Sequence, residues 1–175
     1  MQAAAVAVAP EVKTGRVLEL GCGNCPNPGA DVHHNIVAHA EYVDIAHDLD
    51  VRPWPWKDEE FSKIISTEVF EHLRSDIVDW LGECWRILEP RGLLLIQVPH
   101  AGSWTAWADP THRRAFHDIT FDYFDRSTVW HKQFGEHYFG DTNKWWTVVA
   151  RDVQRTSSCY GELATLRFVL RKDSD

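Results

Sequence analysis

The sequence predicts an α/β protein with a mostly parallel central sheet, and three observations support this prediction. The first is the apolar run Val17-Leu18-Glu19-Leu20, which is typical of a buried parallel strand and stops at Gly21 and Gly23. The second is a helical pattern at 75–88 that lies between two apolar runs, at 61–66 and 92–98. The third is a closing pair of strand patterns at 144–152 and 162–170.

The first predicted strand covers residues 16–20 and ends in the glycine pair. Glycine lets the backbone turn sharply and lets a ligand approach the main chain closely. Glu19 is an acid within this apolar strand. A buried carboxylate is costly without a partner, so backbone N–H groups or a ligand cation should lie beside it. Strand, acid and glycine turn together suggest a nucleotide-type cofactor, although an ordinary strand-to-loop turn has the same pattern.

The segment 22–29 is rich in turn-forming residues, and its two prolines and Gly29 exclude a regular helix directly after the first strand. The following patterns predict a strand at 30–37 and a short third strand within 42–45. The run Pro53-Trp54-Pro55-Trp56 predicts a rigid aromatic loop that packs near the fourth strand.

The helical pattern is clearest over 75–88. Ser75 is expected to cap the start of this helix, and Pro90 is expected to stop it. One apolar face recurs at helical spacing, which makes Cys84 a core thiol. The members of that face are Ile77, Leu81, Cys84, Trp85 and Leu88. The continuous apolar run at 92–98 predicts a strand buried on both faces.

Residues 99–117 are the most chemically loaded stretch, with three His, two Arg, two Trp and one Asp beyond the end of a predicted strand. A loop of this length in a small domain is usually a lid or a binding loop. His112, His100 and Asp109 are candidate catalytic residues, because imidazole titrates near neutral pH and can take a proton from a hydroxyl. Local hydrogen bonds that hold the loop would explain Asp109 and His112 equally well. A short helix is expected at 120–125.

The chain has 175 residues, a net charge of −8 and 44% hydrophobic residues. These values predict a single globular domain over 16–175, preceded by a tail or short helix at 1–15. An acidic chain is not attracted to nucleic acid or anionic membranes by its overall field. Arg113 and Arg114 form a compact basic pair within the loaded stretch, and this pair would either bind an anionic substrate group or be solvated. No apolar stretch approaches the length of a membrane span.

The four cysteines and the absence of a secretory signal predict a cytoplasmic protein with free thiols. Cys22-x-x-Cys25, with His33 and His34 nearby, has the form of half a zinc site. A second ligand pair at metal-site spacing is not evident, so no metal is predicted. Nine tryptophans predict, besides core positions, an aromatic pocket or a surface for homodimer formation.

Several of these stretches occur in an order that resembles the class I S-adenosylmethionine-dependent methyltransferases. The stretches are Glu19-Leu20-Gly21-Cys22-Gly23, Asp44–Leu49, Pro53–Trp56, Phe61–Ile65, Val69–Leu73 and Trp85–Gly92. Asp109-Pro110-Thr111-His112-Arg113 is similar to a signature of one small branch of the type 11 methyltransferases. The resemblance covers about residues 16–125, and ordered motifs are far more specific than a glycine pair.

The resemblance implies a Rossmann-like methyltransferase fold with a terminal antiparallel strand pair and a trimmed first helix. It implies S-adenosyl-L-methionine as cofactor, with Asp48 and the N–H of Leu49 holding the adenine. Asn35 departs from the family, which has an acid there for the ribose hydroxyls; Asp31 and Asp44 are the alternatives. The implied cofactor residues are Glu19, Gly21, Cys22, Gly23, Asn35, Asp48, Leu49 and Glu68.

The implied activity is methyl transfer to a small-molecule, sugar or natural-product acceptor, since the chain has no separate recognition domain. His112 ranks first as a base and His100 second, while Glu71 and His72 either face the pocket or orient the next helix. One alternative is a protein of this fold that binds the cofactor without methyl transfer, as a partner subunit or for another reaction. A nucleic-acid methyltransferase is a second alternative, which the acidic charge argues against.

Overall fold

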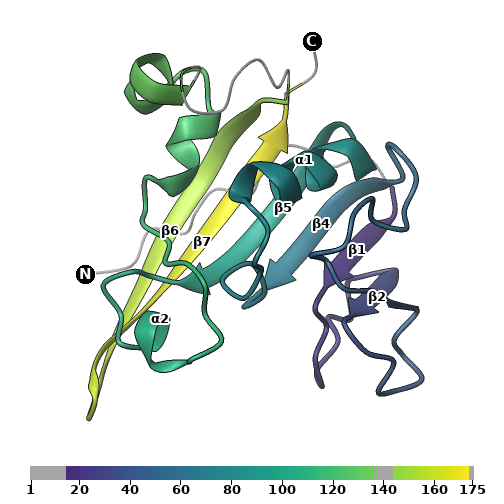
Figure 1. Cartoon of the computed structure of the whole chain (residues 1–175), viewed down its shortest axis with the longest axis horizontal. Coiled ribbons are helices and arrows are strands. Elements are labelled where there is room, and N and C mark those ends of the chain that lie inside the picture. The colour runs from purple at the N-terminus through teal and green to yellow at the C-terminus, as the bar shows by residue number, and fades with distance from the viewer. Residues whose placement is uncertain (1–14, 136, 138–143, 174–175) are drawn as a thin grey trace.

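The computed structural model describes residues 15–135, 137 and 144–173, so the segment predicted at 1–15 lies outside the described residues apart from Gly15. One seven-stranded sheet runs through the described chain in the order β3-β2-β1-β4-β5-β7-β6 (Figure 1). The strands are β1 Val17–Leu20, β2 Val32–Asn35, β3 Ile45–Ala46, β4 Phe61–Thr67, β5 Leu88–Pro99, β6 Trp146–Ser158 and β7 Gly161–Lys172. The helices are α1 Ile77–Ile87 and α2 Thr105–Ala108, with a 3-10 turn η1 Thr120–Phe124 and a π-helical turn η2 His131–Gly135.

The first five strands are parallel, and β7 runs antiparallel to both β5 and β6. The centre of the sheet is β1, where Leu18 pairs with Val32 of β2 on one side and Ile64 of β4 on the other. This arrangement confirms the predicted α/β class, the mostly parallel sheet and the terminal antiparallel pair. The chain from Gly21 to Asp31 contains no helix, which confirms the trimmed first crossover.

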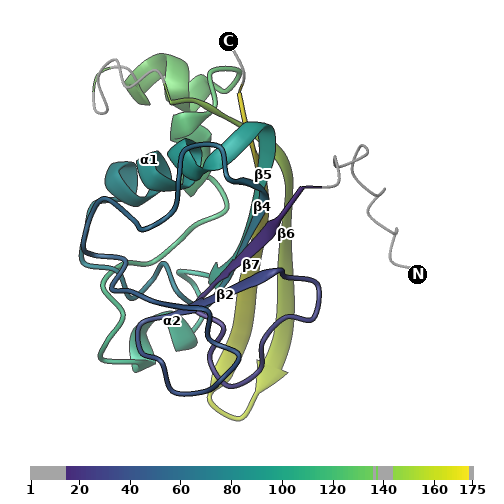
Figure 2. The same cartoon turned by 90° about the vertical axis from the view of Figure 1, so that its right-hand side faces the viewer.

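The described helices lie on one face of the sheet (Figure 2). Burial follows this asymmetry, since Leu94, Ile96 and Val98 of β5 are at most 2% exposed while Leu95 and Gln97 are only half-buried. The prediction that this strand is buried on both faces was therefore wrong at Leu95 and Gln97, although Leu93 is 7% exposed. An unbroken apolar run does not reveal that the described helices cover only one face of the sheet.

Helix α1 packs its apolar stripe on the sheet and contributes Leu81, Cys84 and Ile87 to the core. Trp80, which the periodic pattern did not include, is fully buried and stacks on Phe70 with ring centroids 4.0 Å apart. The predicted cap at Ser75 was wrong. Asp76 occupies the N-cap position without a side-chain hydrogen bond, while the Ser75 N–H binds Asp50 Oδ1 at 2.8 Å.

Several element ends differ from the predicted ones. The third strand is β3, two residues that begin at Ile45, and β5 begins directly after α1 at Leu88. The polar segment predicted between the last two strands instead extends both into a long hairpin, because strand pairing continues to Ser158 and Gly161. The aromatic loop packs near β4 as predicted, with Trp56 edge-on to Phe61 at 6.1 Å.

Candidate functional site

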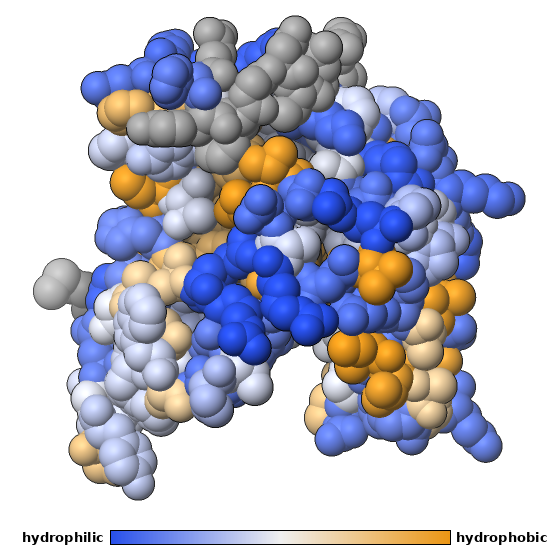
Figure 3. All heavy atoms as spheres, viewed as in Figure 1, coloured by the Kyte–Doolittle hydropathy of each residue, from blue (hydrophilic) through white to orange (hydrophobic). Residues whose placement is uncertain are grey.

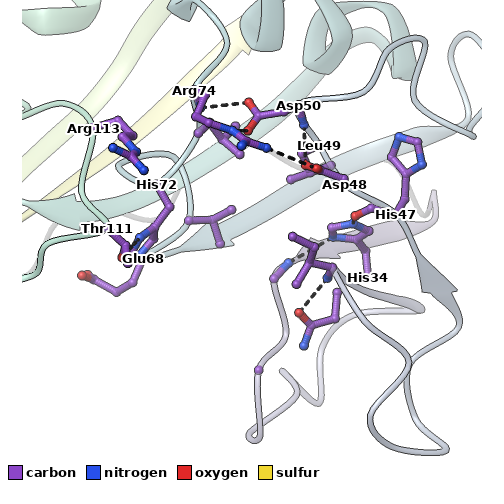
Figure 4. Close-up of a pocket in the computed structure, with 16 residues that line it drawn as sticks. His34, His47, Asp48, Leu49, Asp50, Glu68, His72, Arg74, Thr111 and Arg113 are labelled. Carbon is purple, nitrogen blue, oxygen red and sulfur yellow. Dashed lines mark hydrogen bonds and ion pairs between the residues drawn. The ribbon is translucent and has the colours of Figure 1, made fainter.

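A cavity of about 420 Å³ opens where four parallel strands end, and the residues that follow β1, β2, β3 and β4 all line it. Ligands of open α/β sheets bind at this edge. One side, which we call the strand-end wall, comprises residues 21–23, 34–36 and 47–50. The other side, which we call the histidine wall, comprises the segments 68–74 and 109–113. Glu68, His72 and Thr111 are among the residues of these segments that line the cavity, whereas Glu71, Asp109 and His112 do not line it. Figure 4 shows His34 and His47 on one side and Glu68, His72, Thr111 and Arg113 on the other.

The glycine turn after β1 forms the base of the strand-end wall. Gly21 has φ +70° and Gly23 has φ +54°, backbone conformations that favour glycine. A Cβ on Gly21 would lie 2.3 Å from Val69 Cγ2, whereas a Cβ on Gly23 would meet nothing within 4 Å. The first glycine is therefore required by packing between two strand ends. The second keeps the backbone open to the cavity.

His34, which the sequence analysis assigned only to a discarded zinc site, holds the glycine turn. Its Nδ1 accepts the Gly21 N–H at 3.3 Å and its Nε2–H donates to the His47 carbonyl at 2.8 Å, so one neutral tautomer joins the ends of β1, β2 and β3. The side chain is 2% exposed, and burial lowers its pKa to about 4. The alternation of strand β2 was the only sequence signal for this inward position.

The end of β2 carries Asn35, which lines the cavity together with Ile36. Asn35 Oδ1 accepts the Ile36 N–H at 2.8 Å, and its amide nitrogen lies 3.2 Å from His39 Nδ1. The two alternative acids do not line the cavity. Asp31 accepts the Val17 N–H and Asp44 accepts the His33 N–H, each at 2.8 Å, so both brace the strands.

Glu19 and Cys22 are the two predicted cofactor residues that do not line the cavity. Glu19 is 7% exposed, and its Oε2 accepts the Asn27 N–H and pairs with His33 Nδ1, both at 2.8 Å. The expected partners of this buried acid are thus a backbone N–H and a histidine, which hold the segment after the glycine turn. Cys22 is buried, and its N–H donates to the His34 carbonyl at 2.9 Å.

Asp48, Leu49 and Asp50 complete the strand-end wall. Asp48 Oδ1 accepts the Asp50 N–H at 3.0 Å and its Oδ2 lies 3.6 Å from Arg74 Nη2. Burial raises the pKa of Asp50, but hydrogen bonds from the Ser75 N–H and from Arg74 outweigh burial and lower it overall. Asp50 is thereby ionised at neutral pH and ties the two walls together through Arg74.

The histidine wall begins at Glu68, which follows β4 in a left-handed conformation with φ +54°. Glu71 lies behind it, 1% exposed, and neither of its carboxylate oxygens has a hydrogen-bond partner among the described residues. Burial first, and then the charges of Glu68 and Asp109, raise the pKa of Glu71 to about 8. Burial and the neighbouring His112 lower the pKa of His72, so that ring is neutral at pH 7.

Asp109, Thr111 and His112 reach this wall from the loop after β5. Asp109 Oδ1 accepts both the N–H and the hydroxyl hydrogen of Thr111, at 2.8 and 2.6 Å. The Thr111 hydroxyl oxygen in turn lies 2.9 Å from His72 Nδ1. His112 stands edge-on to His72 with ring centroids 4.7 Å apart, and it lines a cavity of about 90 Å³ beside the main one.

His100 does not line the main cavity. It is 6% exposed and its Nδ1 accepts the Gly102 N–H at 2.9 Å, which holds the turn after β5. The structure therefore separates His100 from His112, although the sequence placed both on one loop. Arg114 is also committed to the fold, because its guanidinium donates to the Leu73 and Ser75 carbonyls. Arg113 lines the main cavity.

The tryptophans divide between core and surface. Trp54, Trp56, Trp80, Trp145 and Trp146 are at most 6% exposed. Trp107 is 70% exposed and Trp104 is 37% exposed, both around α2. Figure 3 shows mainly hydrophilic surface over the centre of the face that carries the helices. The predicted homodimer surface stays a prediction, and other large apolar side chains, such as Ile36 and Val129, are exposed as well.

Residues 18–96 match the family described as Methyltransferase domain, whereas a comparison with curated proteins gave no match. A methyltransferase from Archaeoglobus fulgidus that depends on S-adenosylmethionine has a TM-score of 0.58 at 14% identity, over 92% of this chain and 88% of that one. A putative methyltransferase from Bacillus halodurans has a TM-score of 0.61 at 13% identity, over 91% and 93%.

The [4+2]-cyclase SpnF is also similar, with a TM-score of 0.59 at 13% identity over 92% of this chain and 76% of that chain. At these identities the likeness concerns the fold, and the cyclase shows that one fold serves more than one reaction. Among the described residues, no helix is both long and apolar enough to cross a bilayer. The chain thus has the fold of the S-adenosylmethionine-dependent methyltransferases, and its residues 18–96 match the methyltransferase domain family.

Proposed function

We propose that the chain is an S-adenosylmethionine-dependent methyltransferase whose cofactor occupies the cavity at the strand ends. The observation that carries this proposal is the convergence of six predicted cofactor residues on that cavity: Gly21, Gly23, Asn35, Asp48, Leu49 and Glu68. A volume of about 420 Å³ lies within the range of small-molecule sites. When bound, S-adenosylmethionine supplies an electrophilic methyl group on a sulfonium.

The strand-end wall offers groups that suit a nucleoside. Ile36 is 62% exposed at the cavity, an apolar surface against which a base can pack. Asn35 presents an amide where related enzymes are expected to have an acid. Asp48 and the Leu49 N–H suit the adenine edge, because one accepts and the other donates a hydrogen bond.

The histidine wall is the proposed acceptor side. His112 Nδ1 lies 3.1 Å from the Ala106 carbonyl, which can only accept a hydrogen, so Nε2 keeps its lone pair. When no ligand occupies His112 Nε2, this nitrogen is the proposed base that takes the proton of an acceptor hydroxyl. Asp109 and Thr111 hold the His72 ring beside it. The Asp109–Arg113 stretch supports membership of the small type 11 branch. The proposed acceptor is a small molecule, sugar or natural product, and four free cysteines support a cytoplasmic location.

Calorimetry of S-adenosylmethionine binding to the purified chain tests the proposal. We expect micromolar-range binding that weakens about tenfold in Asp48→Ala, the loss of one charged hydrogen bond. Asn35→Asp should tighten binding several-fold, because a carboxylate accepts two hydroxyl groups at once. Asp44→Asn serves as the control, since Asp44 lies outside the cavity. Absence of binding, or equal weakening in Asp48→Ala and Asp44→Asn, would contradict the proposal.

A further inference from the structure

The histidine wall contains a group of three metal-ligating side chains that the proposed cofactor does not use. One carboxylate oxygen of Glu71 and one ring nitrogen each of His72 and His112 lie within 4.8 Å of one another. Two imidazoles and one carboxylate are a recurrent donor set for divalent first-row transition metals, and they leave coordination positions open. The three side chains come from two distant segments, which the sequence spacing did not bring together.

Glu71 is the observation that points to a missing ligand. Its carboxylate is buried to 1% exposure, and neither oxygen has a hydrogen-bond partner among the described residues. Buried polar groups are almost always paired, and an unpaired buried carboxylate destabilises the protein. A cation between Glu71 and the two histidines would supply the partner that the fold does not.

The two histidines are already oriented for ligation by their outer hydrogen bonds. The Thr111 hydroxyl donates its hydrogen to Asp109, so its oxygen accepts from His72 Nδ1–H at 2.9 Å. The Ala106 carbonyl accepts from His112 Nδ1–H at 3.1 Å. In both rings the lone pair is therefore on Nε2. Metal-ligating histidines characteristically donate their second nitrogen in this way, which fixes the tautomer and the ring orientation.

A second group, formed by His100, His117 and Asp118, has ligand atoms equally close together but lacks these features. His100 Nδ1 already accepts the Gly102 N–H, and His117 Nδ1 is paired with Asp118. One oxygen of Asp118, Oδ1, also has no hydrogen bond among the described residues, but it is ion-paired with His117 Nδ1. The side chains of His117 and Asp118 are 56% and 42% exposed, so water can reach both groups, unlike Glu71. The comparison favours the histidine wall as the metal site.

We infer that Glu71, His72 and His112 bind a divalent first-row transition cation at the acceptor end of the cavity. Given the proposed methyl transfer, on which this part rests, the cation defines the acceptor as a compound with a hydroxyl group. A metal-bound hydroxyl has a lowered pKa, so its proton leaves to water and the O–H electron pair stays on oxygen. His112 is then a ligand, and no histidine base is needed.

Metal titration of the untagged chain tests the site without any cofactor. The exposed thiols of Cys25 and Cys159 are replaced by serine in all variants, because thiolates also bind these metals. Calorimetry with Zn²⁺ and absorption spectra with Co²⁺ should give one ion per chain. Glu71→Gln and His72→Gln should each weaken binding by about 100-fold or more, whereas the matched control His117→Gln should bind as the parent does.

A folding measurement separates ligand loss from misfolding. Glu71→Gln replaces the buried carboxyl by an amide of the same shape, so the metal-free variant should melt near the parent temperature, while Zn²⁺ should raise the melting temperature of the parent alone. Thr111→Val should weaken metal binding about tenfold and Thr111→Ser should restore it, because only the hydroxyl holds His72.

Three outcomes would overturn the inference: no binding, equal binding in Glu71→Gln, or loss of binding in His117→Gln. If the chain binds metal but not S-adenosylmethionine, the metal site stands and the proposed function is refuted. If it binds S-adenosylmethionine but not metal, the proposed function stands and the metal site is refuted. The acceptor class has its own readout. Chelation should abolish turnover while changing the affinity for S-adenosylmethionine by less than about twofold, since the strand-end wall contains none of the three ligands.

Discussion

The two walls of the cavity differ in how their polar groups are satisfied. In the strand-end wall, both ring nitrogens of His34 have partners, and the side-chain oxygen of Asn35 is paired with the next N–H. In the histidine wall, the buried oxygens of Glu71 have none among the described residues. The first wall is therefore complete as folded and suits a ligand recognised by shape and a few hydrogen bonds. In the second wall, the proposed cation would supply the partner that Glu71 lacks among the described residues.

Removal of the His112 side chain from the histidine wall should have the largest effect of the changes considered. It should lower turnover without changing the affinity for the cofactor. With an acceptor that supports release of S-adenosylhomocysteine, His112→Ala should lower kcat by about 100-fold or more, whether the ring acts as base or metal ligand. The affinity for S-adenosylmethionine should change by less than about twofold, because His112 does not line the main cavity. His117→Ala is the control on the same loop. Normal turnover in His112→Ala would make the Asp109–Arg113 stretch purely structural.

Protonation of His34 should have the next largest effect, and on stability. The folded-state pKa of about 4 lies below the ordinary value of 6.5, so the unfolded chain takes up the proton first as pH falls. The contribution of His34 is fully present above pH 6.5 and is lost between pH 6.5 and 4, to a total of roughly 3 kcal/mol. Urea unfolding at pH 7, 5 and 4 measures this loss. His34→Gln does not titrate, so an equal loss in that variant would contradict the assignment.

Substitutions in the glycine turn should have the smallest effect, and that effect is on stability. Comparing Gly21 with Gly23 distinguishes the cost of packing from the cost of backbone conformation. Gly23→Ala should cost about 1–2 kcal/mol of unfolding free energy, because only its positive φ opposes a side chain. Gly21→Ala should cost more, since its Cβ would approach Val69 Cγ2 to 2.3 Å. Val69→Ala should recover part of the Gly21→Ala loss and none of the Gly23→Ala loss. Equal costs at the two glycines would show that Val69 does not restrict the turn.

The sequence predicted the strand-end wall better than the histidine wall, and the reason is physical. Strand ends, glycines and the trimmed crossover follow from local rules of periodicity and turn formation, so Gly21 and Gly23 could be assigned to the end of a strand. Asp48 was assigned only through the resemblance to the methyltransferases. The proximity of Glu71 to His112 depends on how a loop folds back across about 40 residues, which no local rule describes. Glu19 was predicted correctly as an acid with a partner: the Asn27 N–H is a backbone partner of the predicted kind, whereas the second partner, His33, was not predicted.

The burial of Leu95 and of His34 also depends on tertiary contacts that no local rule describes. Leu95 lies in an unbroken apolar run, yet it is half-buried because the described helices cover only the opposite face. His34 belongs to a polar pair, yet it is buried because its ring completes the hydrogen bonding of three strand ends. Tertiary contacts decided both cases against the local pattern.

Hydrogen exchange of the chain with and without S-adenosylmethionine tests the central claim most directly, because it locates the bound cofactor. With S-adenosylmethionine bound, we expect slower amide exchange in residues 21–23, 34–36 and 47–50 and unchanged exchange in the β6–β7 hairpin. Metal or acceptor is not required for this result. Protection confined to other segments, such as the separate cavity formed by Arg52, Val78 and Lys144, would contradict the assignment of the cofactor to the strand ends.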